Sequence, residues 1–231
     1  MNKASLMDGI LIVDKPKGMT SHDVVDVVRR LYGTKKVGHA GTLDPMATGV
    51  LVMLIGRATK RSHDISAEEK EYRATMTLGA RSDTGDAWGE LELSGKPVDF
   101  TDDRIREVFR MFEGRIDQTP PAYSAKKVNG VRMYRLARRG ETVRPAPQKI
   151  TIKDIRVSDI SLPDISYDLV CSKGTYVRQL CADIGEKLGC GGYLSKLERR
   201  RSGAFAIDRA SSLEELKAMD SIRLAERLLS V

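Results

Sequence analysis

The sequence predicts a fold of the α+β class. Residues 72–78 and 165–171 alternate apolar and polar side chains, as half-buried strands do. Residues 105–112 and 177–188 place apolar side chains three or four positions apart, which is the spacing of one helix face. Strands and helices mix irregularly along the chain, with stretches that resemble hairpins. This order favours an α+β domain over a doubly wound sheet.

The N-terminal part of the chain predicts two strands and one helix. Residues 10–13 are a short apolar strand candidate, and residues 50–55 form a longer apolar run. Between them, Ser21 can cap a helix. The apolar face of that helix consists of Val24, Val25, Val28 and Leu31. Gly33 follows, as glycine often does beyond a helix end.

A second helix is predicted in the middle of the chain. Thr101 or Asp102 can begin it, and we expect it to end at Gly114. Its apolar face consists of Ile105, Val108, Phe109 and Phe112. Residues 150–152 alternate like a short strand and precede the longer alternating segment at 165–171.

Two more helices are predicted near the C-terminus. The apolar stripe within residues 177–188 stops at Gly189, which is a common residue at a helix C-terminus. Ser212, with Glu215 three positions later, forms a capping box for a short final helix.

The composition is basic. The 231 residues include 39 Lys and Arg against 32 Asp and Glu, which gives a net charge of +7 and a pI of about 9.3. Such an excess favours a polyanionic partner. The length is sufficient for one large core or two smaller ones.

Cysteine content and hydropathy argue against several classes of protein. Cys171, Cys181 and Cys190 are odd in number and lack C-x-x-C spacing, which speaks against a zinc site or a disulfide framework. Reduced thiols of a cytosolic protein fit better. Residues 10–13 are too short for a signal-peptide core, and no segment approaches the roughly 18 apolar residues of a membrane span. We therefore expect a soluble, cytoplasmic protein.

Positive charge is concentrated in one segment. Residues 126–149 hold eight basic side chains against one acid, Glu141. The segment also contains Asn129, Gly130 and Tyr134. It predicts either a nucleic-acid contact or, as for most charge runs, a solvated face.

The most informative segment is the glycine-flanked loop at residues 38–51. It places one carboxylate, Asp44, just before the apolar run. The following proline pushes Asp44 toward an extended backbone, and glycines on both sides allow tight turns and close approach. Such an acid can be a nucleophile or a base. Taken alone, it can equally be a turn in which Asp44 bonds its own backbone.

This loop and five other motifs resemble those of the bacterial TruB-type tRNA pseudouridine synthases, which isomerise a uridine in the T arm of transfer RNA. Together they extend, in family order, from about residue 9 to 206. The five are DKPxGxTS at 14–21, K-x-Y at 70–72, PPxYSAxK at 120–127, CSKGTYxR at 171–178 and LxR or LRR at 197–200.

The resemblance implies a fold and a domain division. The fold is that of the pseudouridine synthases, a mixed, mainly antiparallel sheet with helices and loops around a central catalytic cleft. We expect a catalytic domain over 1–210, a basic thumb loop at about 123–147, and a short helical tail at 211–231. A full C-terminal RNA-binding PUA domain, which bacterial members usually have, is expected to be absent.

The resemblance also implies three catalytic residues. Asp44 matches the catalytic aspartate, whether it attacks C1′ of the ribose, attacks C6 of the base, or acts through a glycal. Arg178 is expected to pair with that carboxylate, since a guanidinium can hold a carboxylate through two hydrogen bonds. Tyr72 is expected to stack on the flipped base and to help remove the C5 proton. Without the resemblance, Arg178 would read as a solvated helix residue and Tyr72 as a core aromatic.

Eight further residues are expected to bind the substrate. His39 resembles the family histidine that stacks on the opened T arm, and Tyr176 and Leu197 are expected to line the uracil pocket. Lys15 would support the catalytic loop, and Lys60 would reach a phosphate. Three basic residues of the thumb would grip phosphates, namely Lys126, Lys127 and Arg132. Each also has a plain structural alternative, as a packed core residue or a solvated surface residue.

The reaction breaks the bond from C1′ to N1, rotates the base and rejoins it through C5, so it needs no cofactor and no metal. The target base must be flipped out of the T loop. We expect a monomer that acts on the tRNA T stem-loop without a guide RNA or a membrane. Two alternatives remain open, a tRNA-binding or tRNA-folding protein with secondary catalysis, and a hydrolase that would release free uracil.

Overall fold

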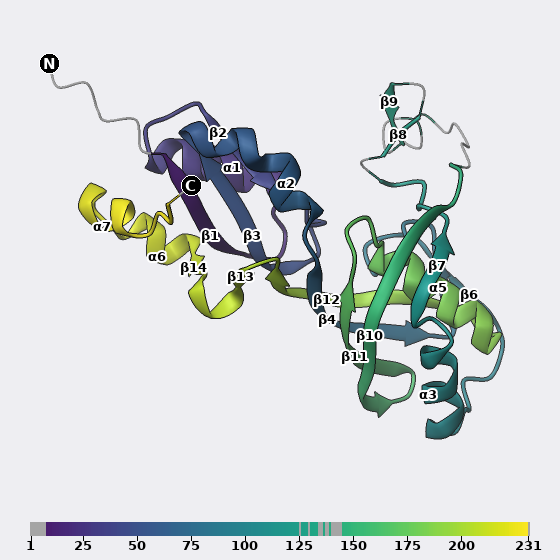
Figure 1. Cartoon of the computed structure of the whole chain (residues 1–231). Coiled ribbons are helices and arrows are strands. Elements are labelled where there is room, and N and C mark those ends of the chain that lie inside the picture. The colour runs from purple at the N-terminus through teal and green to yellow at the C-terminus, as the bar shows by residue number, and fades with distance from the viewer. Residues whose placement is uncertain are drawn as a thin grey trace, which may run out of the picture. The chain divides into compact units, whose positions relative to one another are not determined.

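The computed structural model describes residues 8–124, 126–128, 130–133, 136, 139 and 145–230 (Figure 1). The chain divides into two compact units, the first made of residues 1–72 and 197–231 and the second of residues 73–196. Strands and helices occur in both units, and most strand pairs are antiparallel. The predicted α+β class with a mixed, mainly antiparallel sheet is therefore confirmed. The boundary expected at residue 210 stays a prediction.

Strand β3 (Thr48–Ile55) is the centre of the first unit. Strand β1 (Gly9–Lys15) lies antiparallel along one edge of it, with Lys15 opposite Gly49. Strand β2 (Val37–Ala40) and the last part of β12 (Gly192–Ser202) share the other edge. All of β3 except Thr48 is buried, because a strand paired on both edges and covered on both faces excludes water. This explains the continuous apolar run that predicted it.

Helix α1 (Ser21–Leu31), the 3₁₀ helix η1 (Gly56–Arg61) and helix α2 (Ser62–Ala67) complete the N-terminal part of this unit. The N-cap of α1 is Thr20, whose hydroxyl accepts a hydrogen bond from Asp23 N while the Asp23 carboxylate accepts one from Thr20 N. The prediction of Ser21 as the cap was wrong by one residue. The physical reason is that the Ser21 hydroxyl is buried and bonded elsewhere, to the backbone of Leu43.

The C-terminal residues pack within the first unit. They form β13 (Phe205–Ala206), η2 (Ile207–Arg209), β14 (Ser211–Ser212), α6 (Leu213–Lys217) and α7 (Ser221–Glu226). Strand β14 pairs in parallel with β1, with Val13 opposite Ser211. The predicted capping box is confirmed, since the Ser212 side chain accepts from Glu215 N and the Glu215 carboxylate accepts from Ser212 N.

The second unit is built on strands in the order β12, β4 (Lys70–Leu78), β11 (Asp164–Cys171), β10 (Gln148–Ser161) and β7 (Gly114–Gln118). Strands β10 and β11 form a hairpin that is interrupted by two register shifts. The strand predicted at 150–152 is thus only the start of a much longer one. The strand predicted at 72–78 is confirmed within β4.

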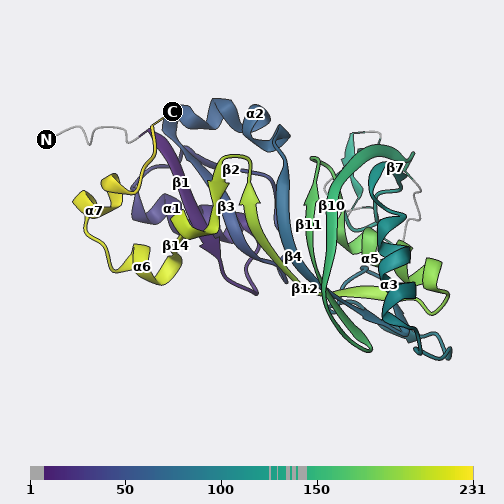
Figure 2. The same ribbon diagram turned by 60° about the horizontal axis from the view of Figure 1, so that its bottom comes forward.

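Helices α3 (Asp102–Arg110) and α5 (Val177–Leu188) lie beside β10 and β7 in both views (Figures 1 and 2). Tyr167 of β11 joins them to the sheet. Its ring meets Phe109 of α3 edge-on at 5.2 Å, and its hydroxyl lies 3.1 Å from Cys181 Sγ of α5. All three cysteines are buried. Burial raises the pKa of the Cys181 thiol to about 12 and also raises that of Cys190.

Helix α5 starts and stops where the sequence predicted, with Gly189 left-handed at φ +89°. Helix α3 has the expected Thr101 cap but ends at Arg110, so the predicted end at Gly114 was wrong. The chain leaves the helix through turns in which Phe112 N and Glu113 N bond carbonyls three residues back. Gly114, at φ +92°, then begins β7.

Three smaller observations complete the description. Strand β5 (Ala80–Ser82) pairs with β6 (Leu91–Leu93), and β8 (Lys127–Val128) pairs with β9 (Val131–Arg132). No helix in the described part of the chain combines the length and the apolar character that crossing a lipid bilayer requires.

Gly49 allows the close approach of β3 and β12, and its replacement should be costly. It lies at φ +95°, and a Cβ there would overlap the carbonyl oxygen of Arg199. We expect Gly49→Ala to lower the free energy of unfolding by about 3–5 kcal/mol. Gly18 is the matched control, since it has the same φ and nothing within 4 Å of its Cβ position. Gly18→Ala should cost only about 1–2 kcal/mol of backbone strain. Denaturant titration measures both, and equal losses would contradict the role of the close approach.

Candidate active site

The loop that carries Asp44 joins β2 to β3 in the first unit and is fixed from α1. The Ser21 hydroxyl donates to Leu43 O at 3.0 Å and accepts from Leu43 N at 2.9 Å. Asp44 itself is half-buried, and its carbonyl accepts a hydrogen bond from Ala47 N at 3.0 Å. Both peptide groups next to the carboxylate-bearing residue are therefore held by short hydrogen bonds.

Lys15 is the second support of this loop. Its side chain is fully buried at the end of β1, and its ammonium donates to Pro16 O and Met19 O at 2.8 Å and to Pro45 O at 3.3 Å. Pro45 O also accepts from Gly18 N at 2.9 Å. The ammonium thus joins the 14–21 motif to the Asp44 loop, as the sequence analysis expected of Lys15.

Burial lowers the pKa of the Lys15 ammonium to about 8, and the negative charge of Asp44 is the largest effect that opposes this shift. A desolvated ammonium loses hydration that its carbonyl partners only partly replace. The same electrostatic coupling means that Lys15 contributes positive charge to the surroundings of Asp44.

Arg199 is a third support, which the sequence analysis did not predict. It lies on β12 and is 1% exposed. Its guanidinium donates to Val50 O at 2.7 Å, to Gly41 O at 2.9 Å and to Thr42 O at 3.4 Å. The sequence signal was present in the motif at 197–200, but an arginine in a charged run reads as a surface residue.

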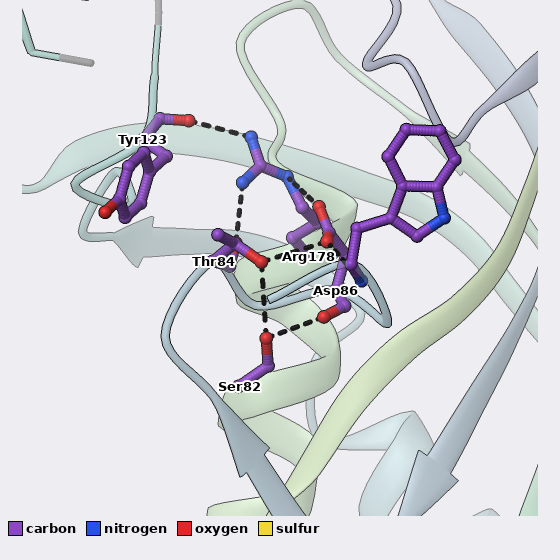
Figure 3. Close-up of polar contacts among 6 residues, drawn as sticks. Ser82, Thr84, Asp86, Tyr123 and Arg178 are labelled. Carbon is purple, nitrogen blue, oxygen red and sulfur yellow. Dashed lines mark hydrogen bonds and ion pairs between the residues drawn. The ribbon is translucent and has the colours of Figure 1, made fainter. Parts of the chain in front are cut away.

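Arg178 lies in the second unit, near the start of α5, and is 5% exposed. Figure 3 shows its partners in that unit. It donates to Thr84 O at 2.6 Å and to Tyr123 O at 2.8 Å, and its Nε lies 3.7 Å from the Asp86 carboxylate. The guanidinium is therefore held in a defined orientation by groups from two separate segments.

Asp86 is the buried carboxylate that the sequence analysis missed. The turn at 82–90 holds it tightly, because Asp86 Oδ1 accepts from Thr84 Oγ1 at 2.9 Å and from Trp88 N at 3.0 Å. Ser82 donates to Asp86 O at 2.6 Å (Figure 3). The sequence gave no sign that the acid at the end of the 83–86 turn faces Arg178.

The other predicted residues of the second unit surround the start of α5. Tyr176 is the N-cap residue of α5, and its backbone N–H and carbonyl both bond to the Gln118 amide, at 2.8 and 3.1 Å. Lys126 donates to Ala146 O at 3.3 Å and to Gln148 Oε1 at 3.4 Å, so it closes the base of the predicted thumb.

Much of the predicted thumb lies outside the described residues. Lys127 and Arg132 belong to β8 and β9, and their side chains lie outside the described residues, as do Asn129, Tyr134, Glu141 and other residues of the basic segment. Their predicted role in phosphate binding stays a prediction.

The remaining predicted residues belong to the first unit. Tyr72 on β4 and Leu197 on β12 are 9% and 8% exposed. His39 on β2 is half-buried, and Lys60 in η1 is exposed. The first unit thus brings Lys15 to the Asp44 loop, whereas Arg178 and Tyr176 belong to the second. The convergence of Asp44, Tyr72 and Arg178 stays a prediction.

No cluster of His, Cys, Asp and Glu suited to a metal ion occurs among the residues for which the structure gives positions. The chemistry that the site offers is that of a fixed carboxylate near buried cations.

Comparisons with known proteins agree with the predicted fold. Over 91% of its length the chain superimposes on a chain of an archaeal box H/ACA Nop10–Cbf5 complex, with 29% identity and a TM-score of 0.69. A chain of an H/ACA ribonucleoprotein bound to a substrate RNA containing 2′-deoxyuridine gives 26% identity over 96% of the chain and a TM-score of 0.70. The chain spans only 53% and 58% of the length of these two solved chains. The fold is the one that the motifs implied, that of the pseudouridine synthases.

Sequence comparisons narrow this class. The model of the TruB family pseudouridylate synthase N-terminal domain matches residues 29–177, and that of the tRNA pseudouridylate synthase B C-terminal domain matches residues 178–230. The chain belongs to the TruB family of pseudouridylate synthases.

Curated relatives are similar over almost the whole chain. A tRNA pseudouridine synthase B of Syntrophotalea carbinolica is 48% identical over 97% of this chain and 74% of its own length. The protein of the same name from Geotalea uraniireducens is 47% identical over 97% and 73%. That of Opitutus terrae is 44% identical over 97% of this chain and 93% of its own length.

The depressed pKa of Lys15 predicts a pH dependence of stability. Between pH of about 8 and 10.5 the unfolded chain binds a proton at Lys15 that the folded chain has released. The free energy of unfolding should therefore rise with pH through this window, and below it the full burial penalty applies. Relative to Lys15→Met, the wild type should gain roughly 2–3 kcal/mol from pH 8 to 10.5. Denaturant titration at several pH values measures this difference, and a constant difference would contradict the shift.

The buried Arg178–Asp86 pair predicts that loss of the Asp86 charge lowers stability and activity. Asp86→Asn removes the charge partner of a buried guanidinium, and we expect a loss of about 3–5 kcal/mol of stability together with lower activity. Asp83→Asn in the same turn is the control, because Asp83 is exposed and its side chain only accepts from Glu90 N. It should cost about 1 kcal/mol. Thermal unfolding and turnover measurements compare the two, and similar effects would argue against the pair.

Proposed function

We propose that this chain converts a uridine in the T loop of tRNA to pseudouridine, with Asp44 as the catalytic carboxylate. The observation that carries the proposal is the way Asp44 is held. Its loop is fixed by Ser21, Lys15 and Arg199 through hydrogen bonds to the loop backbone, and Asp44 itself is half-buried. A pre-organised carboxylate is what a reaction at a glycosidic carbon needs. The named relatives act on tRNA.

The reaction is an isomerisation. The bond from C1′ to N1 of the uridine breaks, the base rotates, the bond from C1′ to C5 forms, and the C5 proton leaves as N1 gains one. Asp44 supplies the carboxylate on which the glycosidic exchange depends. Tyr72 stacks on the flipped base and assists the removal of the C5 proton, and Leu197 and Tyr176 line the uracil pocket.

Arg178 acts in this proposal as the cation that pairs with Asp44. Its contacts with Asp86, Thr84 O and Tyr123 O support the role. A guanidinium whose orientation is already set by such contacts loses little side-chain entropy when it binds a carboxylate. His39 stacks on the opened T arm, and Lys126 with the other thumb cations binds phosphates.

We further propose that the protein works without a guide RNA, as a monomer, in the cytoplasm. Support for guide-free action is the higher identity, 44–48%, to relatives named as tRNA pseudouridine synthases, against 26–29% for the chains of H/ACA ribonucleoproteins. Three buried thiols fit a reducing compartment.

The test is turnover on an unmodified tRNA transcript, read by chemical derivatisation of pseudouridine and mass spectrometry. Wild-type protein should yield one modified T-loop uridine per tRNA and no free uracil. Asp44→Asn should lower turnover by about 10³-fold or more, with the tRNA dissociation constant changed less than about threefold. Asp64→Asn is the matched control, because it removes the same charge from an exposed side chain of the same unit.

Two results would overturn the assignment. Unmodified T-loop uridine after incubation with wild type would defeat the function, and near-normal turnover of Asp44→Asn would defeat the role of the residue. If binding or folding of tRNA survives in cells that carry Asp44→Asn while modification is lost, the RNA-folding role is separate from catalysis.

A further inference from the structure

We propose that an exposed basic surface of the first unit binds phosphates of the RNA stem next to the target loop. This basic surface consists of Arg30, Lys35, Lys36, Lys60 and Arg61, all exposed. The inference rests on the proposed function, since the RNA substrate is the polyanion concerned. The sequence analysis expected phosphate contacts from the thumb and from Lys60. The basic surface adds contacts from three elements, the end of α1, the start of β2 and η1.

Backbone contacts bring the three elements together. The carbonyl of Lys36 accepts a hydrogen bond at 2.8 Å from Gly56 N, so the start of β2 lies against the start of η1. Arg29, in the last turn of α1, donates to Val37 O at 3.4 Å. The end of α1, the start of β2 and η1 are therefore neighbours, and Figure 1 shows α1, β2 and the following α2 side by side.

The local carboxylates do not neutralise this surface. Asp26 pairs with Arg29 at 2.9 Å, Asp8 pairs with Arg57, and Asp64 lies 3.6 Å from the His63 ring. Within residues 8–124 and the other described segments, no carboxylate forms an ion pair with any of the five cations of the basic surface. Hydrogen bonds from Arg57 lower the pKa of Asp8, and Asp8 is close enough for the charge of Lys36 to add to this shift. Five exposed cations with no carboxylate at ion-pair distance still produce a local positive field that attracts a polyanion.

The side chains of this surface suit phosphates better than bases. Base recognition in single strands uses aromatic faces, and the nearby aromatic Tyr32 is half-buried with its hydroxyl donating to Leu224 O at 2.9 Å. Lys and Arg without an aromatic platform position a nucleic acid through its phosphates.

The position of the surface indicates which phosphates it binds. Helix α2 follows η1 along β2, and Ser62 donates to His39 O at 3.3 Å. Strand β2 carries His39 and ends at Ala40, four residues before Asp44. The basic surface therefore begins where β2 begins and leads toward the residues proposed to hold the opened loop. A stem that enters the site along this path places its phosphates on these cations.

Lys35 and Lys36 are the residues to test, since both side chains are exposed and the backbone contacts of this turn do not depend on them. We expect Lys35→Glu/Lys36→Glu to raise the dissociation constant for an unmodified tRNA transcript by about tenfold. The slope of the logarithm of the association constant against the logarithm of the salt concentration should become shallower by about 1.4–1.8. Each phosphate contact contributes about 0.7–0.9 to this slope. The kcat should stay unchanged and KM should rise, because the contact is equal in ground and transition states.

The control is Lys96→Glu/Lys187→Glu, which makes the same change in charge at two exposed lysines of the second unit. Glu186 neighbours both, so they do not belong to a surface of one sign. An equal effect of both double variants on affinity and salt slope would overturn the proposal, since only net charge would then matter. An unchanged salt slope of Lys35→Glu/Lys36→Glu would overturn it as well.

Two further measurements keep the outcomes separate. If the double variant unfolds at a lower temperature than wild type, the single variants Lys35→Gln and Lys36→Gln replace it as the test. Each should change the salt slope by about half of the change expected for the double variant. The salt slope is read from binding alone, so it tests the basic surface even if wild-type protein forms no pseudouridine. Failure of the proposed function and failure of this inference are thereby distinguished.

Discussion

The burial of two cations beneath one loop is the constraint on which the first unit depends. A buried ammonium or guanidinium is unfavourable unless hydrogen bonds compensate the loss of water. Lys15 and Arg199 each donate to three backbone carbonyls, which belong to the 14–21 motif, to residues 41–45 and to β3. Apart from Val50 O of β3, those carbonyls belong to the irregular segments at 16–19 and 41–45, so the cations and the loop satisfy each other. The conformation around Asp44 depends on this exchange as well as on the local turn closed by Ala47 N and Asp44 O.

The same exchange explains the glycine at position 49. The guanidinium of Arg199 reaches the loop only because the backbones of β3 and β12 come close together, and a side chain at position 49 would keep them apart. Gly49, Lys15 and Arg199 come from three distant motifs and together fix the Asp44 loop. In the second unit, Asp86 of a turn and Arg178 at the start of α5 form a comparable long-range contact.

Regular elements with a clear burial pattern could be predicted from the sequence. The continuous apolar run at 50–55 gave β3, which is buried on both faces, and the apolar stripe at 177–188 gave α5, which buries one face. Strand β12 could not be found in this way, since its buried positions include Arg199 and its sequence reads as a charged run. The length of β10 was also missed, because the register shifts break the alternation that marks a strand.

The candidate site was predictable in part and for a different reason. Asp44, Arg178 and Lys15 were proposed because their motifs resemble those of a family. Their spacing alone was equally consistent with a local turn or with solvated surface residues. Asp86 was missed because a carboxylate in a short turn usually bonds its own backbone, which it also does here. Only the fold shows that its other oxygen faces a buried guanidinium. Long-range pairing of this kind leaves no periodic signal in a sequence.

The burial of all three thiols has a practical consequence. A thiol with a pKa near 12, such as that of Cys181, holds almost no thiolate at neutral pH, and its access to reagents is blocked by packing. Maleimide dyes should therefore ignore the native cysteines. A single cysteine engineered at an outward-facing position then becomes the sole attachment point for a fluorophore, and the three native cysteines need not be replaced first.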